Sequence, residues 1–183
     1  MEIDTLPADL AGDLDAAFPR LVSALQDGVY SGVLRMVGDS HDAEEIAQEA
    51  FLRAYRALRT YPPERIRDLR PAPWVWTIAI NLCRNHYRTR ARRGTPSPLP
   101  DDLAASDRTP EDEAANRHLG DALARHLAEL PWEMRRAVVL RHVVGLPYEE
   151  IGEVLRRPVG TVKSDVHRGL ARLRRTIPQE VDR

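Results

Sequence analysis

The segment 148-YEEIGEVLRRPVGTVKSDVHRGLARLRR-175 decides the fold of the C-terminal part of this chain. Its first third places Ile151, Val154 and Leu155 on one side of a helix, and the triplet 156-RRP-158 then interrupts that helix. Proline suits the opening of a helix because its φ is already helical and its missing N–H has no helical partner there. Pro158 therefore predicts a second helix, and the whole segment predicts a helix-turn-helix.

The expected second helix has one apolar face and one cationic face. Its apolar stripe, which must pack against protein, is Val162, Val166, Leu170 and Leu173. The opposite face and its flanks carry Lys163, Ser164, His167, Arg168, Ala171, Arg174 and Arg175. Residues 156–175 hold seven cations and one acid, Asp165, which projects about 60° from the apolar stripe. The cationic face predicts a recognition helix for the DNA major groove; a helical hairpin with a solvated basic face is the alternative.

Charge is distributed in blocks along the 183 residues, although the whole chain has a formal net charge of only −1. Residues 1–50 hold eleven acids and two cations, residues 84–93 hold five cations and no acid, and residues 130–183 carry a net charge of +4. Such alternation indicates more than one macromolecular partner, and the length allows two small domains. The single Cys83 excludes an internal disulfide. Without a signal peptide or a long apolar run, we expect a cytoplasmic protein with no membrane insertion.

Two amphipathic helices are expected in the N-terminal part. The first covers residues 14–37 and stops at a glycine, and Asp42 with Glu45 resembles a capping box that opens the second, which continues to about residue 58. The buried side of this second helix is Ile46, Ala47, Ala50, Phe51, Ala54 and Leu58; the other side is Glu45, Gln48, Glu49, Leu52 and Arg56. Leu52 is isolated among polar groups, which indicates either an ordinary exposed leucine or the anchor of a docking surface for a basic partner helix.

A proline-rich segment separates these helices from a third. Residues 61–73 contain four prolines and predict an irregular loop, after which 74-WVWTIAINLCRNHYRTRARR-93 predicts a helix that begins apolar and ends basic. The face left over from the core carries Trp76, Asn81, Arg84, Asn85 and Arg88. These side chains combine base stacking with phosphate contact and so favour binding to unpaired DNA. The alternative is a partly buried aromatic helix with a solvated basic end.

Residues 94–113, GTPSPLPDDLAASDRTPEDE, predict a flexible acidic linker, since they include four prolines and few apolar side chains. The apolar spacing of the next expected helix is marked by Leu119, Leu123, Leu127 and Leu130. Pro131 then restarts a helix that continues to Val144, and Gly145 stops it. These two helices are expected to support the helix-turn-helix.

The predicted fold class is therefore all-α, with two small helical domains joined by a flexible acidic linker. The N-terminal helical bundle covers residues 1–93, and the C-terminal helix-turn-helix domain covers residues 114–183. The sequence contains no phosphate-binding glycine loop, no metal-ligand cluster and no spacing typical of a nucleophile with its base. We accordingly expect no enzyme activity, no cofactor and no metal.

This pattern resembles the extracytoplasmic-function sigma factors of bacterial RNA polymerase. Residues 42–58, DAEEIAQEAFLRAYRAL, resemble the core-binding segment of that family, and residues 73–88, PWVWTIAINLCRNHYR, resemble its promoter-melting segment. Residues 130–175 resemble its C-terminal domain, so the resemblance covers almost the whole chain. It implies a factor that binds core RNA polymerase, directs it to specific promoters and helps to melt DNA.

The resemblance also implies roles for single residues. Binding to the clamp helices of the β′ subunit, within a polymerase surface that includes the β subunit, is implied for Asp42, Glu45, Gln48, Glu49, Phe51 and Leu52. Contact with the minus-ten element is implied for Trp74, Trp76, Asn81, Arg84, Asn85 and Arg88. Contact with the minus-thirty-five element is implied for Lys163, Ser164, His167 and Arg168, with Arg157 and Thr161 on phosphates. An anti-sigma factor is the other partner that the resemblance allows.

The chain departs from the family pattern at two positions of the second helix of the helix-turn-helix. Asp165 stands where many members have a cation. Gly169 stands where many have alanine, although glycine inside a helix costs about 1 kcal/mol relative to alanine. Together with the proline-rich segment 61–73, these departures leave the promoter sequence unassigned.

The competing interpretation is a response regulator with a C-terminal helix-turn-helix, because residues 160–173 also resemble the recognition helices of that class. A receiver domain would require buried β-strands, a phosphorylatable aspartate at a strand end and a partner lysine. The N-terminal half reads as helical and contains no lysine. The sequence therefore favours the sigma factor.

Overall fold

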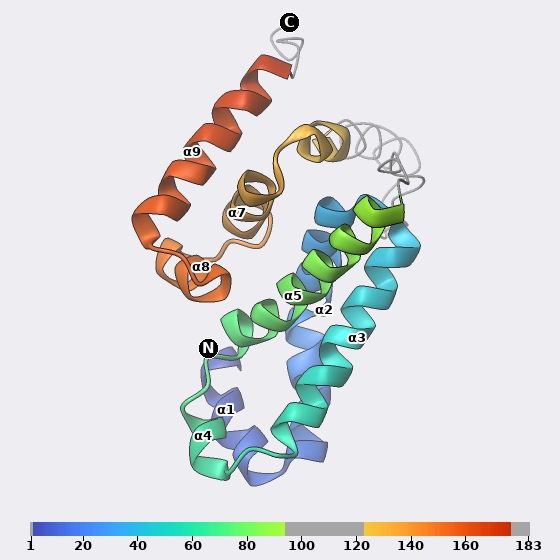
Figure 1. Ribbon diagram of the computed structural model, residues 1–183. Helices are drawn as coiled ribbons and strands as arrows, with labels where there is room; N and C mark the ends of the chain where they lie inside the picture. Colours follow the sequence, from blue (N-terminus) through green and yellow to red (C-terminus); the bar gives the residue numbers. More distant parts are fainter. Residues whose placement is uncertain (1, 94–122, 177–183) are drawn as a thin grey trace, which may run out of the picture.

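The computed structural model describes residues 2–93 and 123–176, and all regular secondary structure in these two ranges is α-helical (Figure 1). Helices α1 to α5 form the N-terminal domain; residues 123–129, which are also helical, and helices α7 to α9 form the C-terminal domain. The predicted all-α class with two small domains is confirmed. The predicted linker, residues 94–113, lies outside the described residues.

The N-terminal domain begins with an antiparallel pair, α1 (Glu2–Gly12) and α2 (Leu14–Val37). Asp13 caps α2 by accepting a hydrogen bond from the Ala16 amide at 3.0 Å. At the other end Gly38 adopts a left-handed conformation, φ 79°, which glycine enters without strain. The helix predicted over residues 14–37 is confirmed, whereas α1 was not predicted from the sequence.

Helix α3 (Ser40–Leu58) packs on α2 and α5. The predicted capping box at Asp42 is wrong, because the cap of the helix lies three residues earlier, at Asp39, which accepts from the Asp42 amide at 2.9 Å. The predicted buried side is confirmed: the buried residues of α3 include Ile46, Ala47, Ala50, Phe51, Ala54 and Leu58.

Two further helices occupy much of the segment that the prolines had marked as a loop. Helix α4 (Pro63–Arg67) lies within it, and α5 (Pro71–Arg93) begins three residues before the predicted start at Trp74. The loop prediction for residues 61–73 is therefore wrong in part. Proline is tolerated in the first turn of a helix, where amide groups have no intrahelical acceptor, and these prolines open helices rather than break them.

The C-terminal domain contains the predicted helix-turn-helix. Helix α7 (Trp132–His142) precedes α8 (Tyr148–Leu155) and α9 (Val159–Thr176). Pro158 lies just before α9 and caps it, because its carbonyl accepts from the Val162 amide at 3.1 Å. The turn itself is made by Arg156 in a left-handed conformation, φ 51°. In the predicted apolar stripe Val162, Val166 and Leu173 are buried and Leu170 is partly buried.

Gly169 has a packing role at the crossing of α7 and α9. A Cβ atom at this position would lie 2.6 Å from Val138 Cγ2 and 3.5 Å from Met134 Cβ. An alanine at this position would therefore force Val138 to shift or the two helices to move apart. Glycine has a lower helix propensity than alanine, but its lack of a side chain lets α7 approach α9 more closely.

The two domains pack directly against each other, with α8 against α5 and α7 against α2 (Figure 1). Arg135, which is 2% exposed, donates from Nη1 to the Met36 carbonyl at 2.9 Å, near the end of α2. The rings of Tyr87 and Trp132 stack with centroids 5.4 Å apart. Arg70 pairs with two acids of α8, as described below. We name these residues the interdomain contact.

Candidate DNA and polymerase interfaces

The exposed side of α9 gathers the four residues that the resemblance assigned to the minus-thirty-five element. Lys163, Ser164, His167 and Arg168 are all exposed and line one shallow depression. Helix α7 lies between α9 and the N-terminal helices, so α9 forms an outer edge of the molecule (Figure 1). A cationic helix in this position can enter a duplex groove without meeting the N-terminal domain.

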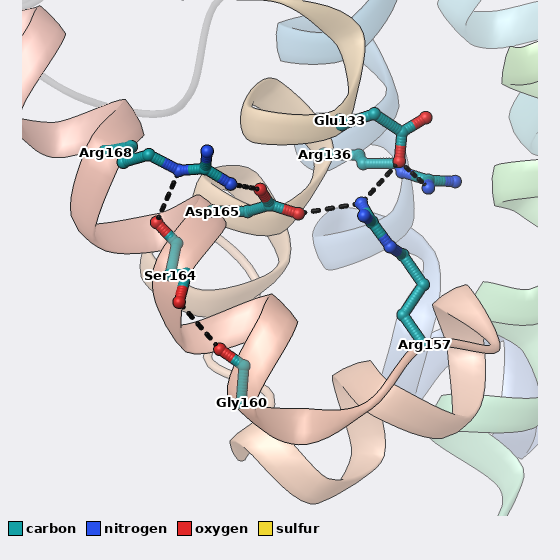
Figure 2. A network of polar contacts seen from close by, with 7 residues as sticks. All are labelled: Glu133, Arg136, Arg157, Gly160, Ser164, Asp165 and Arg168. Atoms are coloured by element: carbon teal, nitrogen blue, oxygen red, sulfur yellow. Dashed lines mark hydrogen bonds and ion pairs between the residues drawn. The ribbon is translucent and has the colours of Figure 1, made fainter.

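Beside this surface a network of charged side chains ties α9 to the turn and to α7 (Figure 2). Asp165 accepts from Arg157 Nη1 and from Arg168 Nη2, both at 2.7 Å. Arg157 Nη1 also donates to Glu133 at 2.8 Å, and Glu133 pairs in addition with Arg136. Arg157 is therefore not a free phosphate contact in this conformation, because its guanidinium is shared between two carboxylates.

Helix α5 presents a polar surface that matches most of the predicted minus-ten set. Its exposed members are Asn81, Arg84, Asn85 and Arg88. Arg84 Nη2 donates to Asn81 Oδ1 at 3.1 Å, so a guanidinium and an amide act there as one unit. This surface can offer hydrogen bonds to bases and positive charge to phosphates.

Trp76 does not belong to that surface. The expectation that it lies on the exposed face of α5 is wrong, because the side chain is 2% exposed. Its ring fills the space over Gly32, where a Cβ atom would lie only 2.5 Å from Trp76 Cη2 and 3.0 Å from Val144 Cγ2. At about 100° per residue Trp76 lies about 140° from Asn81 and on the side of Val75, Ala79 and Cys83, so the helical period itself places it toward the core. Helix α2 and the C-terminal domain cover that side.

Trp74 is half-buried at the amino-terminal end of α5, next to α8. Its ring lies 6.1 Å from that of Tyr61, and it lines an open pocket together with Arg70 and Glu153. Arg70 Nη1 is 3.0 Å from Glu153 Oε1, and Arg70 also pairs with Glu150. The C-terminal domain therefore stands beside one end of the candidate minus-ten surface.

Four of the six predicted polymerase contacts lie on the outer side of α3. Glu45, Gln48 and Leu52 are exposed, with Leu52 at 43%, and Glu49 is half-buried. Leu52 is one of only two large hydrophobic side chains exposed among the described residues; the other is Tyr87. The carboxylates and the leucine thus form one continuous face that no other helix of the described ranges covers.

The remaining two predicted contacts have intramolecular positions. Phe51 is 9% exposed and belongs to the hydrophobic core, so its assignment to a docking surface is wrong for this conformation. Asp42 is half-buried and faces α5, where its Oδ2 lies 3.0 Å from Arg90 Nη1 and 3.3 Å from His86 Nε2. The side chain of Asp42 therefore joins α3 to α5.

The sequence did not single out Arg70 or Tyr87 as contacts between domains. No local pattern identifies them, since Arg70 and Glu153 are 83 residues apart along the chain, and Tyr87 and Trp132 are 45 residues apart. Asp165 did carry a signal, as one acid among seven cations, but its burial and its two arginine partners depend on the turn geometry.

Within the described ranges, no group of His, Cys, Asp or Glu side chains could hold a metal ion, and no helix is long and apolar enough to cross a membrane. Cys83 is buried, and desolvation raises the pKa of its thiol to about 12. The thiol is therefore protonated and unreactive at neutral pH.

Comparisons with known proteins agree with this architecture. Residues 21–93 match Sigma-70 region 2, and residues 120–173 match Sigma-70, region 4. The ECF RNA polymerase sigma factor SigE of Mycolicibacterium smegmatis is 39% identical over 172 residues, covering 91% of this chain and 64% of that protein. The ECF RNA polymerase sigma factor SigW of Bacillus subtilis is 34% identical over 175 residues, covering 91% of each.

Two solved structures share the fold. The structure of CnrH in complex with the cytosolic domain of CnrY has a TM-score of 0.71 and 23% identity, covering 96% of this chain and 97% of that chain. The sigma factor RpoE of Bartonella quintana, in complex with the anti-sigma factor NepR, has a TM-score of 0.68 and 19% identity, covering 91% and 98%.

An all-helical pair of domains, one of them a helix-turn-helix with a cationic outer face, is typical of DNA-binding proteins, and the matches to Sigma-70 regions 2 and 4 make this one a protein of transcription initiation. This chain belongs to the extracytoplasmic-function sigma factors. Proteins of this family bind RNA polymerase, direct it to promoters and are not themselves enzymes. The region 2 match in residues 21–93 also removes the alternative of a response regulator, which would need a receiver domain there.

Proposed function

We propose that α9 reads the minus-thirty-five element as duplex DNA through Lys163, Ser164, His167 and Arg168. The observation that carries this proposal is that all four side chains are exposed together on an outer edge of the molecule. Lysine and arginine bind phosphates or guanine edges, while serine and histidine offer shorter donors and acceptors. Thr161, at the first turn of α9, is assigned to the phosphate backbone. Arg157 is assigned there only on binding, when it exchanges one of its carboxylate partners for a phosphate.

The minus-ten element is assigned to Trp74, Asn81, Arg84, Asn85 and Arg88 of α5. Amide groups and guanidinium groups hydrogen-bond to base edges that become accessible when the duplex opens. The half-exposed ring of Trp74 provides a stacking surface at one end of this row. Trp76, being buried, serves by fixing α5 against α2 rather than by touching DNA.

Docking on core RNA polymerase is assigned to Glu45, Gln48, Glu49 and Leu52 of α3. The proposed partner surface is the clamp helices of the β′ subunit, within a larger surface that includes the β subunit. An apolar side chain with carboxylates beside it suits a basic helix, because burial of the leucine gives affinity and the acids give orientation. Asp42 supports this face from within by holding α3 to α5.

The domains must separate for both DNA surfaces to work at once. The two promoter elements lie more than one turn of DNA apart, about 50 Å at roughly 34 Å per turn. We propose that the linker, residues 94–113, spans this distance in an extended form: its 20 residues reach about 66–72 Å fully extended and about 25 Å as a relaxed coil. The interdomain contact then describes the protein before it engages a promoter.

We further propose a cytoplasmic location, where the polymerase works, and control by an anti-sigma factor. Two structures of similar fold support such control, since CnrH is bound to the cytosolic domain of CnrY in one and the sigma factor RpoE to the anti-sigma factor NepR in the other.

Run-off transcription with core polymerase on genomic DNA tests the proposed function. The wild-type chain should produce discrete promoter-dependent transcripts. Arg168→Ala should reduce them at promoters that need the upstream element, while the circular dichroism spectrum stays unchanged. Unselective initiation by the wild-type chain, or full activity of the variant, would contradict the assignment to α9.

A further inference from the structure

A buried carboxylate lies within the cationic helix that faces DNA. Asp165 is 3% exposed, and each of its oxygens accepts from a different arginine: Oδ2 from Arg157 and Oδ1 from Arg168, both at 2.7 Å (Figure 2). A buried carboxylate is strongly unfavourable unless it is paired and hydrogen-bonded. The two guanidinium groups supply that pairing, so Asp165 and its arginines act as one unit.

Arg168 is held along one edge of its guanidinium group. Nη2 donates to Asp165, and Nε donates to the Ser164 carbonyl at 3.4 Å. Nε and Nη2 form one edge of a planar fork that carries five N–H groups, so the Nη1 side remains for another acceptor. The side chain is 59% exposed, and this free side is accessible from solvent.

The carboxylate that holds Arg168 is itself anchored to the rest of the domain. Arg157 comes from the turn before α9, and its Nη1 bridges Asp165 to Glu133 of α7 at 2.8 Å. Glu133 also pairs with Arg136, which is 7% exposed. Oδ2 of Asp165 is therefore held by the turn and α7, and Oδ1 is left to hold Arg168.

We propose that Asp165 is a positioning residue for promoter sequence: it fixes the Arg168 guanidinium so that its free side meets one base pair of the upstream element. The inference rests on the function proposed for α9. Bidentate recognition of guanine needs two N–H groups in a fixed plane. An arginine side chain that is oriented before binding loses less conformational entropy when it contacts DNA than a mobile one does. It also forms poorer hydrogen bonds with base pairs whose acceptors lie elsewhere.

Two other roles for Asp165 make different predictions. If Asp165 only holds the turn against α9, replacing it weakens binding to every DNA sequence by the same factor. If it only neutralises Arg168, its loss strengthens binding to every sequence and leaves selectivity unchanged. A positioning residue is distinguished by a loss of selectivity at one base pair, and that loss must depend on Arg168.

The test measures base selectivity with the full chain bound to core polymerase. Preferred upstream sequences are first selected from duplexes randomised in that element. Affinities are then measured for the selected duplex and for all its single-base-pair variants. The proteins compared are wild type, Asp165→Asn, Arg168→Ala, the double variant and Arg157→Gln. The last breaks the anchor to Glu133 while the Arg168 pair stays in place.

The wild type should discriminate at the base pair read by Arg168 by about 5- to 150-fold. Asp165→Asn, Arg168→Ala and the double variant should all lose this discrimination to the same extent and keep it at other positions, because the two residues act in series. Arg157→Gln should lower the melting temperature yet keep most of the discrimination.

Retained discrimination in Asp165→Asn, or a loss additive to that of Arg168→Ala, would overturn the proposal. If Asp165→Asn does not fold, Arg168→Lys decides, since this exposed substitution keeps the charge but lacks the planar fork. It should keep the salt dependence of binding and lose the discrimination; full discrimination by lysine would also overturn the proposal. Failure of the wild type to select any sequence would refute the function of α9 itself.

Discussion

Reversing the charge of Arg70 should open the molecule without unfolding either domain. Arg70 pairs with Glu150 and Glu153 across the interdomain contact, and side-chain exposure is 52% for the arginine, 17% for Glu150 and 58% for Glu153. Arg70→Glu would place a third carboxylate beside these two. The attraction between α8 and the amino-terminal end of α5 would become repulsion.

The size of the effect follows from the exposure of the groups. An exposed ion pair contributes about 0.2–1 kcal/mol, and the pair with the less exposed Glu150 belongs at the upper end of that range. Arg70→Glu removes two attractive pairs and adds two repulsions of similar size. The free-energy difference between packed and separated domains should therefore shift by about 1–3 kcal/mol at low salt. The ratio of packed to separated domains should thus fall by about 5- to 150-fold, and less at high salt because of screening.

Energy transfer between dyes on the two domains measures this ratio. Ser23→Cys and Thr176→Cys provide exposed attachment sites, and native Cys83 should not react because burial raises the pKa of its thiol to about 12. Arg70→Glu should lower transfer and tighten binding to core polymerase, because a competent state that is more populated raises apparent affinity.

Two controls separate this mechanism from a general effect of charge. Arg67→Glu is a matched reversal, since Arg67 is 55% exposed and pairs with Glu64 inside α4. It should leave energy transfer unchanged. Adding Glu150→Arg and Glu153→Arg to Arg70→Glu should restore the packed form. Unchanged transfer in Arg70→Glu at low salt, or no recovery in the triple variant, would refute the reasoning.

Five other substitutions test the surfaces and the packing. Leu52→Arg should leave helical content and melting temperature nearly unchanged but abolish co-elution with core polymerase; persistent co-elution would exclude α3 as the docking face. In urea titrations, Gly169→Ala should lower the free energy of unfolding by about 1–3 kcal/mol through overpacking. Gly160→Ala is the matched control, because a Cβ atom at Gly160 would meet nothing within 4 Å, and it should raise the free energy of unfolding by about 0.5–1 kcal/mol. Trp76→Ala should cost about 3–5 kcal/mol of stability. Asn81→Ala should keep its stability yet reduce permanganate-reactive melting on closed promoters, with rescue by a pre-melted template.

The periodic parts of the fold were predictable because burial repeats along a helix. The buried side of α3 and the stripe on α9 follow a spacing of three and four residues that the sequence shows directly. The errors fall at helix beginnings, where one side chain decides the boundary. Asp39 and Asp42 are both capable caps, and only the fold shows that Asp39 has the extended backbone that a cap needs.

The candidate surfaces were predicted less completely, because exposure depends on what packs over a helix. Trp76 and Asn81 were placed on one face of α5, although a helix turns by about 140° between them. Trp76 packs against Gly32 and Val144, while Asn81 remains exposed. Gly32 has no side chain, and this gap accepts the indole ring. A contact of this kind depends on two positions more than forty residues apart, and neither residue shows it alone.

The arginines of this chain show most clearly that sequence alone does not reveal which side chains remain exposed. Arg135 is buried and donates to the Met36 carbonyl, Arg157 is shared between two carboxylates, and Arg88 is exposed on α5. All three stand in basic stretches, so charge alone would assign each of them to DNA. The buried guanidinium holds two domains together, the shared one orders a turn, and only the exposed one is free to meet a phosphate without first breaking a contact seen here. A basic block therefore predicts that some of its members bind nucleic acid, while the acids and carbonyls brought near by the fold decide which.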